Sequence, residues 1–538
     1  MHPAVEERLA RLAPDQRAAA TAPPGPSLCI APAGSGKTTT LVARAAWLVA
    51  TGTPPDAIGA ITFNKRAAVE MTERLDAALA PLGLPPGTVR VRTFHALGRE
   101  ILLDAGVAVE PLADRPAILA EVAPWADEAG LLRLDTVVSR LKVELGVAPA
   151  EVVADPQAGP TARAYVAYEA AVAASGGLDF DDLILRAIAE LERDAGLLAR
   201  WRAHCRELLV DEVQDVDRAQ LRLALHLAAP ANRIFLVGDD DQSIYGWRLA
   251  DVRRILGLAA LLPGLRRVDL EVNYRCPRQV VERAVRLVAN NGERFTKTIR
   301  ARPGATGRLV LAPDPSDETV RLERAIRSWP DDGGTRAVLA RTNRELLPAV
   351  VVALALESPF RAARIDLLVD SPAVDTLLER AAGLAIEGEH LLVTLGRLRR
   401  SCVGDRATTE LATAFLGWAI GHADVASLAA AIGAIRLRLA ELRRDDARLT
   451  LATAHATKGL EFDHVVVVGM EIGRFPSARA VSQAEDPARA YEEERRLAYV
   501  AWTRARRSLT LLYDPAVPSP FLLEAFSADE LGLSPASG

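Results

Sequence analysis

Short apolar runs, separated by long amphipathic stretches, dominate the hydrophobic pattern of this chain. Four of these runs predict strands buried on both faces of a parallel sheet: Ser27–Ile30, Leu208–Val210, Ile234–Val237 and Val465–Val468. Each ends in polar or glycine residues, and ligands of open α/β sheets bind at the carboxyl ends of strands. Residues 100–200 and 346–445 are rich in Ala, Leu and Arg and predict helices. We therefore expect an α/β protein with two parallel-sheet cores, each interrupted by a mainly helical insertion.

A glycine-rich segment follows the first run. Residues 31–38 read Ala-Pro-Ala-Gly-Ser-Gly-Lys-Thr, and a predicted helix follows them. Such a loop directs backbone N–H groups and the positive end of the helix at a polyphosphate. Lys37 would reach the β- and γ-phosphates, and the Thr38 hydroxyl would coordinate Mg²⁺. Although Ala31 departs from the strict phosphate-loop pattern, we predict nucleoside triphosphate binding by Ala33, Gly34, Ser35, Gly36, Lys37, Thr38 and Thr39.

Two acidic residues, Asp211 and Glu212, follow the strand predicted at Leu208–Val210. This arrangement suits Mg²⁺-dependent phosphate hydrolysis. Asp211 would hold the metal, directly or through water, and Glu212 would orient and deprotonate the attacking water.

Lysine is scarce, whereas arginine is abundant. The five lysines stand at positions 37, 65, 142, 297 and 458. A compact ammonium group fits a phosphate cradle better than a planar guanidinium does. The rarity of lysine therefore strengthens the assignment of Lys37.

Length and charge limit the remaining possibilities. The 538 residues predict several domains, and the net charge of −5 gives no global basic signature of nucleic-acid binding. The four cysteines are scattered, which argues against a disulfide framework or a zinc site. The first residues lack the pattern of a signal peptide, and no uncharged apolar run approaches membrane-spanning length; Leu411–Gly421 is too short. We expect a cytoplasmic, nucleoid-associated protein without a membrane segment.

Several more motifs occur along the chain. The longest are residues 237–248, Val-Gly-Asp-Asp-Asp-Gln-Ser-Ile-Tyr-Gly-Trp-Arg, and residues 453–462, Thr-Ala-His-Ala-Thr-Lys-Gly-Leu-Glu-Phe. Shorter ones occur at residues 13–16, 61–68, 92–95, 273–275 and 493–505. In this order the motifs resemble those of the UvrD/Rep/PcrA-type helicases of superfamily 1A, and the resemblance runs from about Leu12 to Tyr513.

The resemblance implies two RecA-like motor cores in tandem. The first core would comprise residues 1–95 and 201–268, with a helical insertion at 96–200. The second would comprise residues 269–345 and 446–513, with a reduced insertion at 346–445. We expect residues 514–538 to form a Pro/Ser-rich, peripheral C-terminal tail.

The resemblance also implies an ATP site to which both cores contribute. Gln16 would read the adenine edge and Tyr274 would stack on the base. Arg275 and Arg504 would act as arginine fingers from the second core, and such groups contribute roughly 10³–10⁵ in rate in related systems. Gln242 would couple the γ-phosphate to nucleic acid, and Glu461 would accept a hydrogen bond from the ribose or from DNA-side groups.

Single-stranded nucleic acid requires aromatic faces for stacking and donors for phosphates. Phe63, Tyr245 and Trp247 are the predicted stacking residues. The predicted phosphate or coupling contacts are Asn64, Thr93, His95, Arg248 and His455. Core packing is the alternative for any one of these aromatics.

The predicted function is an ATP- and Mg²⁺-dependent DNA helicase or translocase that moves 3′ to 5′ on single-stranded DNA. We expect a monomer that acts on single strands and on single-strand/duplex junctions, with repair or replication proteins as possible partners. The reduced insertion at 346–445 leaves open a translocase that does not unwind duplex. Two other classes also remain open: an ATPase that acts on a protein machine such as RNA polymerase, and an ATP-gated binding module.

Overall fold

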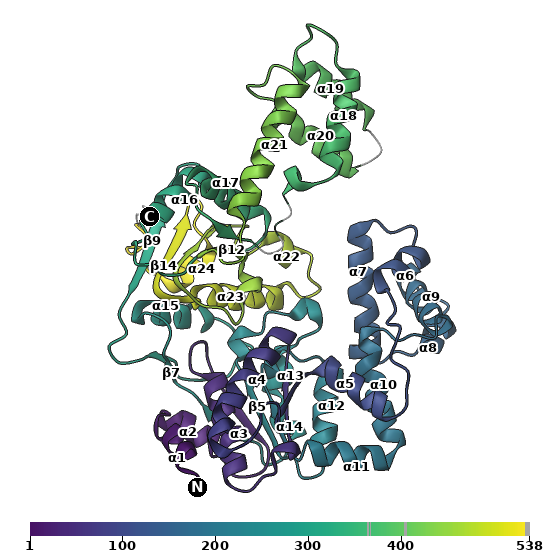
Figure 1. Ribbon diagram of the computed structural model, residues 1–538, viewed down its shortest axis with the longest axis vertical. Coiled ribbons are helices and arrows are strands. Elements are labelled where there is room, and N and C mark those ends of the chain that lie inside the picture. Colours follow the sequence, from purple (N-terminus) through teal and green to yellow (C-terminus); the bar gives the residue numbers. More distant parts are fainter. Residues whose placement is uncertain (363–364, 366, 403–405, 533–538) are drawn as a thin grey trace, which may run out of the picture. The chain divides into compact units, whose positions relative to one another are not determined.

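The computed structural model describes residues 1–362, 365, 367–402 and 406–532 (Figure 1). These residues form two compact units. The first contains residues 1–306 and 480–503, and the second contains the described residues of the ranges 307–479 and 504–538.

A six-stranded parallel sheet forms the centre of the first unit. Its strand order is β3-β2-β4-β5-β1-β6. The strands are β1 (Ser27–Ile30), β2 (Ile58–Thr62), β3 (Arg90–Thr93), β4 (Glu207–Val210), β5 (Ile234–Gly238) and β6 (Arg266–Asp269). A small two-stranded parallel sheet pairs β7 (Val272–Asn273) with β8 (Arg300–Ala301).

Both faces of this sheet are covered, which explains its continuous apolar runs. Leu208 and Val210 of β4 pack into one hydrophobic cluster, whereas Leu209 packs into another on the opposite face. Side chains alternate between the two faces of a strand, so an apolar residue is needed at each of the positions 208, 209 and 210. The strands predicted at residues 27–30, 208–210 and 234–237 are confirmed.

Helices cover the sheet and continue into the predicted insertion. Those around the sheet are α1 (Pro3–Ala10), α2 (Pro14–Ala20), α3 (Lys37–Ala50), α4 (Lys65–Leu79), α5 (Phe94–Asp104), α10 (Phe180–Arg193), α11 (Ala195–His204), α12 (Arg218–Ala228), α13 (Val252–Leu256) and α14 (Leu258–Leu261). The helices α15 (Arg278–Val288) and α23 (Pro487–Trp502) also belong to this unit.

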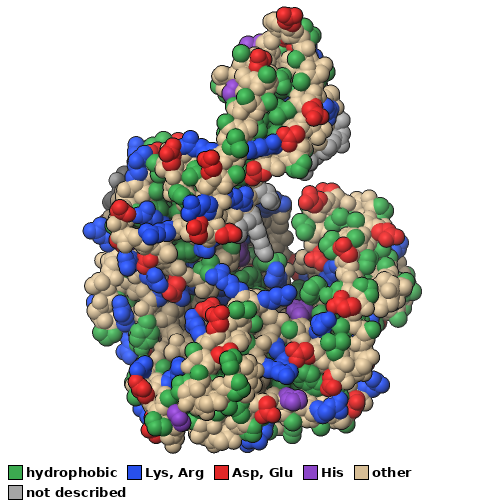
Figure 2. All heavy atoms as spheres, viewed as in Figure 1, with side chains coloured by type: hydrophobic (Ala, Val, Ile, Leu, Met, Phe, Trp, Pro, Cys, Tyr) green, Lys and Arg blue, Asp and Glu red, His purple; other side chains and the backbone are tan. Residues whose placement is uncertain are grey.

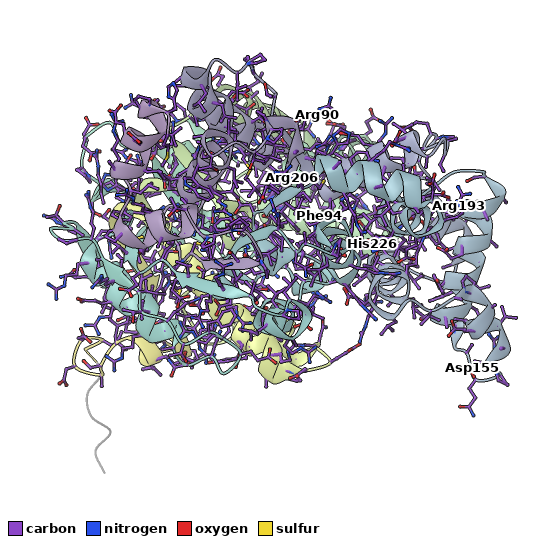
Figure 3. All side chains as sticks on the ribbon, turned by 90° about the horizontal axis from the view of Figure 1, so that it is seen from below. Arg90, Phe94, Asp155, Arg193, Arg206 and His226 are labelled. Atoms are coloured by element: carbon purple, nitrogen blue, oxygen red, sulfur yellow. The ribbon has the colours of Figure 1, made fainter. Side chains whose placement is uncertain are left out.

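Four helices of the insertion form a lobe with its own small core. They are α6 (Arg115–Val122), α7 (Glu128–Ser139), α8 (Pro149–Ala154) and α9 (Pro160–Ala174), and a π-helical turn, Arg140–Leu145, follows α7. Leu134, Val138 and Tyr168 are buried in this core. In Figure 3, Asp155 projects outward from the end of this lobe, whereas Phe94 lies in the interior of the unit.

The second unit contains another six-stranded parallel sheet, in the order β11-β12-β10-β13-β14-β9. Its strands are β9 (Arg308–Pro313), β10 (Arg336–Ala340), β11 (Phe360–Arg361), β12 (Leu449–Thr453), β13 (Phe462–Val467) and β14 (Ala505–Tyr513). The strand predicted at residues 465–468 is confirmed for residues 465–467, which belong to β13, and Val468 follows the end of the strand. The fold is therefore α/β with two parallel-sheet cores, as predicted.

Helical segments of the second unit include the predicted insertion at 346–445. The helices are α16 (Glu318–Arg327), α17 (Leu347–Ala355), α18 (Ala373–Leu384), α19 (Leu391–Ser401), α20 (Arg406–Trp418), α21 (Val425–Leu442) and α24 (Pro520–Ala525). The short helix α22 (Ala478–Ser482) begins in this unit, and its residues from Ala480 onward belong to the first unit. The lobe of α18–α21 has a separate core around Leu377, Leu395 and Phe415.

Basic and acidic side chains are interspersed on the face seen in Figure 2.

Two expectations about the organisation of the chain differ from the structure. Residues 269–306 and 480–503, expected in the second core, group with the first unit. The segment after Asp514 is not peripheral up to residue 531, because Phe521 and Leu522 are fully buried and Tyr513 donates to the carbonyl of Leu531. Burial of these apolar side chains outweighs the Pro/Ser-rich composition around them. Residues 533–538 lie outside the described residues.

None of the helices in the described ranges is both long enough and apolar enough to cross a bilayer.

Candidate nucleotide-binding site and aromatic cluster

The glycine-rich loop joins β1 to α3 and bends sharply around two glycines. Gly34 and Gly36 have φ values of 69° and 87°, which residues with a Cβ atom rarely adopt. Gly36 is the N-cap of α3, so the first-turn N–H groups of that helix point into the loop without a capping side chain. The Ser35 hydroxyl is buried and has no hydrogen-bond partner among the described residues. These features fit a polyphosphate ligand.

Gln16 lies directly against this loop. Its Nε2 donates to the carbonyl of Ser35 at 2.8 Å, and its Oε1 accepts from the Ala13 N–H at 3.1 Å. A Cβ atom on Gly36 would lie 2.6 Å from Gln16 Nε2. Gln16 therefore supports the loop, and its role in reading adenine remains a prediction.

The two acidic residues at the end of β4 face the start of α3. Lys37 Nζ lies 3.0 Å from the Glu212 carboxylate. Asp211 Oδ1 accepts from the Glu212 N–H at 3.0 Å, and Glu212 has a φ of 54°, which is rare for a non-glycine residue. Burial alone would lower the pKa of Lys37, but Glu212, Asp211 and Asp239 outweigh it and raise that pKa. Lys37 is therefore an ammonium ion surrounded by carboxylates.

A chain of hydrogen bonds joins the end of β4 to the end of β5. The Gln214 side chain donates to Glu212 and accepts from the Asp239 N–H at 2.9 Å. Gln242 Nε2 donates to Asp239 Oδ2 at 2.7 Å. The predicted catalytic residues Glu212 and Gln242 are thus connected through Gln214 and Asp239. Neither connecting residue is assigned a role by the sequence analysis. Their positions shortly after buried strands could have indicated one.

The segment Asn273–Arg275 lies on the other side of the loop. Asn273 Nδ2 donates to the Ala33 carbonyl at 2.7 Å, and the Tyr274 N–H donates to the Gly34 carbonyl at 2.8 Å. A Cβ atom on Gly34 would lie 2.8 Å from the Cβ of Arg275. Tyr274 is 40% exposed, so its ring is accessible. The structure thus brings both predicted residues to the phosphate loop and adds Asn273, which fixes their backbone.

Three predicted residues belong to the second unit. Arg504 is 1% exposed, and its guanidinium donates to the Leu460 carbonyl at 3.1 Å. Glu461 accepts from Arg506 at 3.0 Å. Burial, followed by the charges of Arg341 and Lys458, lowers the pKa of His455 to about 3. The roles predicted for Arg504, Glu461 and His455 remain predictions.

Three predicted aromatic residues meet at the carboxyl ends of β2 and β5. The rings of Phe63 and Tyr245 are stacked, with centroids 5.3 Å apart and an interplanar angle of 15°. Trp247 meets Tyr245 edge to face at 6.2 Å and is 54% exposed. The guanidinium carbon of Arg248 lies 4.7 Å from the centroid of the Trp247 ring. We call Phe63, Tyr245 and Trp247 the aromatic cluster.

Two of the predicted phosphate contacts cap helices. The Asn64 side chain accepts from the Ala67 N–H at the start of α4, and Thr93 accepts from the Ala96 N–H at the start of α5. Helix N-termini attract anions, so both positions suit a phosphate. His95 meets Phe180 edge to face at 5.7 Å. Sequence reasoning missed Phe180, which is 58% exposed and lies 85 positions further along the chain.

A buried ionic cluster lies beneath the end of β5. Lys297 Nζ lies within 2.9 Å of carboxylate oxygens of Asp239, Asp240 and Asp241, whose side chains are fully buried. Arg294 pairs with Asp241 through two hydrogen bonds. Burial would lower the pKa of Lys297, but the three aspartates raise it. The cluster ties β5, and the loop that follows it, to residues 294–297.

Comparisons with known proteins identify the family. A model of the UvrD/REP helicase N-terminal domain matches residues 12–262, and a model of the UvrD-like helicase C-terminal domain matches residues 415–515. The ATP-dependent DNA helicase UvrD2 of Mycobacterium tuberculosis is 32% identical over 554 residues, which cover 94% of this chain and 78% of that protein.

Two enzymes of Escherichia coli are also similar. DNA helicase II is 28% identical over 615 residues, covering 93% of this chain and 84% of the relative. The ATP-dependent DNA helicase Rep is 27% identical over 640 residues, covering 96% and 94% respectively. Both domain models and all three relatives point to the family that the motifs indicate. This chain belongs to the UvrD/Rep family of superfamily 1A ATP-dependent DNA helicases.

Proposed function

We propose that this protein is a DNA-stimulated ATPase that moves 3′ to 5′ along single-stranded DNA. One observation carries the proposal furthest: both functional regions of the first unit share the end of β5. Asp239 and Gln242 are hydrogen-bonded to each other and are linked through Gln214 to Glu212. Tyr245 and Trp247 of the aromatic cluster follow within a few residues. A change at the phosphate site therefore has a short covalent path to the stacking residues.

ATP with Mg²⁺ is the proposed substrate and cofactor. The phosphate loop and the first turn of α3, with Lys37 and Thr38, would hold the phosphates, and Thr38 and Asp211 would hold the metal. The metal would supply charge neutralisation at the transferred phosphoryl group. Glu212 would take the proton of the water that attacks the γ-phosphorus while the bond to the ADP oxygen breaks.

The ion pair between Lys37 and Glu212 suggests how the base becomes available. In this structure the ammonium group neutralises Glu212 at 3.0 Å. A bound triphosphate offers Lys37 stronger anionic partners, which would draw it away from the carboxylate. Glu212 would then be free to accept a proton from water. Arg275 beside the loop, and Arg504, are the proposed arginine fingers.

Single-stranded DNA is the proposed track. The aromatic cluster offers faces on which bases can stack, at about 1–3 kcal/mol per base. Asn64, Thr93, His95, Arg248 and His455 are the proposed phosphate or coupling contacts. We place the protein in the cytoplasm at the nucleoid, as a monomer that serves DNA repair or replication.

Duplex unwinding is the part of the function that the insertion at 346–445 puts in question. The alignment with E. coli DNA helicase II spans 615 positions, more than the 538 residues of this chain, so that relative contains residues that this chain lacks. A translocase that does not unwind is therefore the second candidate.

Strand displacement tests polarity and unwinding together. Duplexes with a 3′ tail should be separated in the presence of ATP, whereas those with a 5′ tail should stay intact. Unwinding from the 5′ tail alone would contradict the proposed polarity. If neither duplex opens while single-stranded DNA still stimulates ATP hydrolysis, the second candidate is correct. Hydrolysis that is indifferent to DNA would instead favour an ATPase directed at a protein partner.

A further inference from the structure

The loop that carries Tyr245 and Trp247 is held by a glutamate from the C-terminal part of the chain. The N–H of Gly246 donates to Glu493 Oε1 at 3.0 Å. Gly246 begins a short 3₁₀ turn, Gly246–Arg248, and Glu493 lies on α23. This hydrogen bond fixes the backbone between the two aromatic residues.

The Glu493 carboxylate occupies the space beside Gly246 where a side chain would lie. A Cβ atom on Gly246 would lie 2.3 Å from Glu493 Oε2, far inside van der Waals contact. The backbone of Gly246 does not have a positive φ, and the three atoms nearest to the added Cβ all belong to the Glu493 carboxylate. Glycine is therefore needed at this position for the contact with Glu493 rather than for the turn.

A second contact anchors the same loop one helical turn away. Arg489 pairs with Asp251 at 2.8 Å, and residues four apart on a helix share a face. Arg489 and Glu493 thus hold residues 246 and 251, at the two ends of the segment that contains Trp247. Leu249, within this segment, has a φ of 65°. A non-glycine residue keeps this strained conformation only where surrounding contacts hold it.

The helix that supplies Glu493 is itself fixed. Glu492 accepts from the Gly292 N–H at 2.7 Å, and Arg496 donates to the Glu293 carbonyl at 2.7 Å. At the other end of α23, the carbonyl of Thr503 accepts from the guanidinium of Arg275 at 3.2 Å. Sixteen residues of α23 span about 24 Å. One rigid helix therefore connects the segment beside the phosphate loop with the loop of the aromatic cluster.

We propose that Glu493 is a positioning residue, which holds the Tyr245–Trp247 loop in the shape that binds single-stranded DNA and links that loop through α23 to Arg275. The inference rests on the proposed function. Glu493 touches neither nucleotide nor DNA in this account. Its loss should therefore weaken the response to DNA without changing hydrolysis in the absence of DNA.

The test compares four variants with the wild-type protein. They are Glu493→Ala, Glu493→Gln, Gly246→Ala and the double variant Gly246→Ala/Glu493→Ala. Binding of a fluorescein-labelled oligothymidylate is measured by anisotropy, and ATP hydrolysis is measured against the concentration of the same oligonucleotide. The matched control is Glu282→Ala, because Glu282 is an exposed glutamate on α15 that pairs with its neighbour Arg278 at 2.7 Å.

Removal of the acceptor should raise the oligonucleotide concentration for half-maximal stimulation about tenfold, the size expected for one hydrogen bond to a charged group. Glu493→Gln keeps an acceptor oxygen and should stay within about threefold of wild type. Gly246→Ala should match Glu493→Ala, because the added methyl group displaces the carboxylate. The double variant should be no worse than Glu493→Ala, since two changes that break one contact are not additive.

Wild-type-like responses of both Glu493→Ala and Gly246→Ala would overturn the inference. So would a fully additive double variant, because the two residues would then act independently. Thermal unfolding identifies any variant that is globally destabilised, and Gly246→Ala retains the test if Glu493→Ala unfolds. If the wild-type protein does not bind the oligonucleotide and its ATP hydrolysis is not stimulated by it, the proposed function is overturned, and this inference with it.

Discussion

The phosphate site and the aromatic cluster are built in opposite ways, although both lie at the carboxyl ends of strands of the same sheet. At the phosphate site, charged groups are paired with one another, as Lys37 is with Glu212. In the aromatic cluster, Trp247 is 54% exposed, and its loop is held by Glu493 at the Gly246 N–H and by Arg489 at Asp251. Charge chemistry requires exact partners in a water-poor site, whereas stacking requires an accessible ring face.

The comparison also separates two kinds of support. Beneath β5, Lys297 and three aspartates form a buried ionic cluster that fixes the polar residues of the phosphate side. On the DNA side, Glu493 and Arg489 of α23 hold a loop that stays at the surface. Substitutions in the ionic cluster should therefore lower stability or the rate of hydrolysis, whereas substitutions at Glu493 or Arg489 should lower the affinity for DNA.

The largest expected effect comes from Glu212→Gln. The substitution keeps the size of the side chain but removes the base, so kcat for ATP hydrolysis should fall about 10²- to 10⁴-fold. Phosphate release measures the rate, and thermal unfolding checks that the variant is folded. Activity within about threefold of wild type would show that Glu212 is not the base.

Lys297→Met should destabilise the first unit by about 3–5 kcal/mol, because it leaves three buried carboxylates without their shared cation. Denaturant unfolding measures the change. The matched control is Lys65→Met at an exposed helix start, which should change stability by about 0.5 kcal/mol or less. Equal stability of the two variants would remove the argument for a structural ionic cluster.

Trp247→Ala should weaken binding of single-stranded DNA by about 1–3 kcal/mol, the contribution of one stacked base. Hydrolysis without DNA should not change, because the ring lies outside the hydrogen-bonded phosphate site. Anisotropy of a labelled oligonucleotide measures the affinity. Trp125→Ala provides the control, since Trp125 is 58% exposed but lies in the helical lobe. Similar losses in both variants would argue against a specific platform.

The smallest expected effect is that of pH on His455, because its imidazole stays neutral throughout the working pH range. Burial, Arg341 and Lys458 lower its pKa to about 3, compared with about 6.5 in the unfolded chain. The unfolded state therefore binds a proton that the folded state does not, and stability declines as pH falls from about 6.5 towards 3. NMR titration of labelled histidines should show no inflection for His455 above pH 5. An inflection near 6.5 would contradict its burial beside two cations.

Sequence alone predicted the parts of the structure that local patterns encode. The buried strands were evident because both faces of each sheet demand apolar residues, and the glycine-rich loop was evident from its spacing. Asn273, Gln214 and Lys297 were not assigned, since their partners are distant; Asn273 contacts Ala33, 240 positions earlier. The buried tail was missed because Phe521 and Leu522 belong to an apolar run of only three residues within a Pro/Ser-rich context.

In the candidate site too, the sequence showed local features but not contacts between distant segments. The residue types that carry chemistry could be read from the motifs, and the structure places Lys37, Glu212, Tyr274 and Arg275 around one loop. The supporting contacts could not be read, because a hydrogen bond such as that between Gly246 and Glu493 joins segments 247 residues apart and leaves no local pattern.

Reciprocal binding tests the central claim most directly, which is that the phosphate site and the aromatic cluster are coupled. The affinity of an oligothymidylate is measured with and without a non-hydrolysable ATP analogue, and the affinity of the analogue is measured with and without the oligonucleotide. Our account predicts that each ligand changes the affinity of the other by the same factor, in the range of about 5- to 150-fold. Affinities that are unaffected by the other ligand would contradict it.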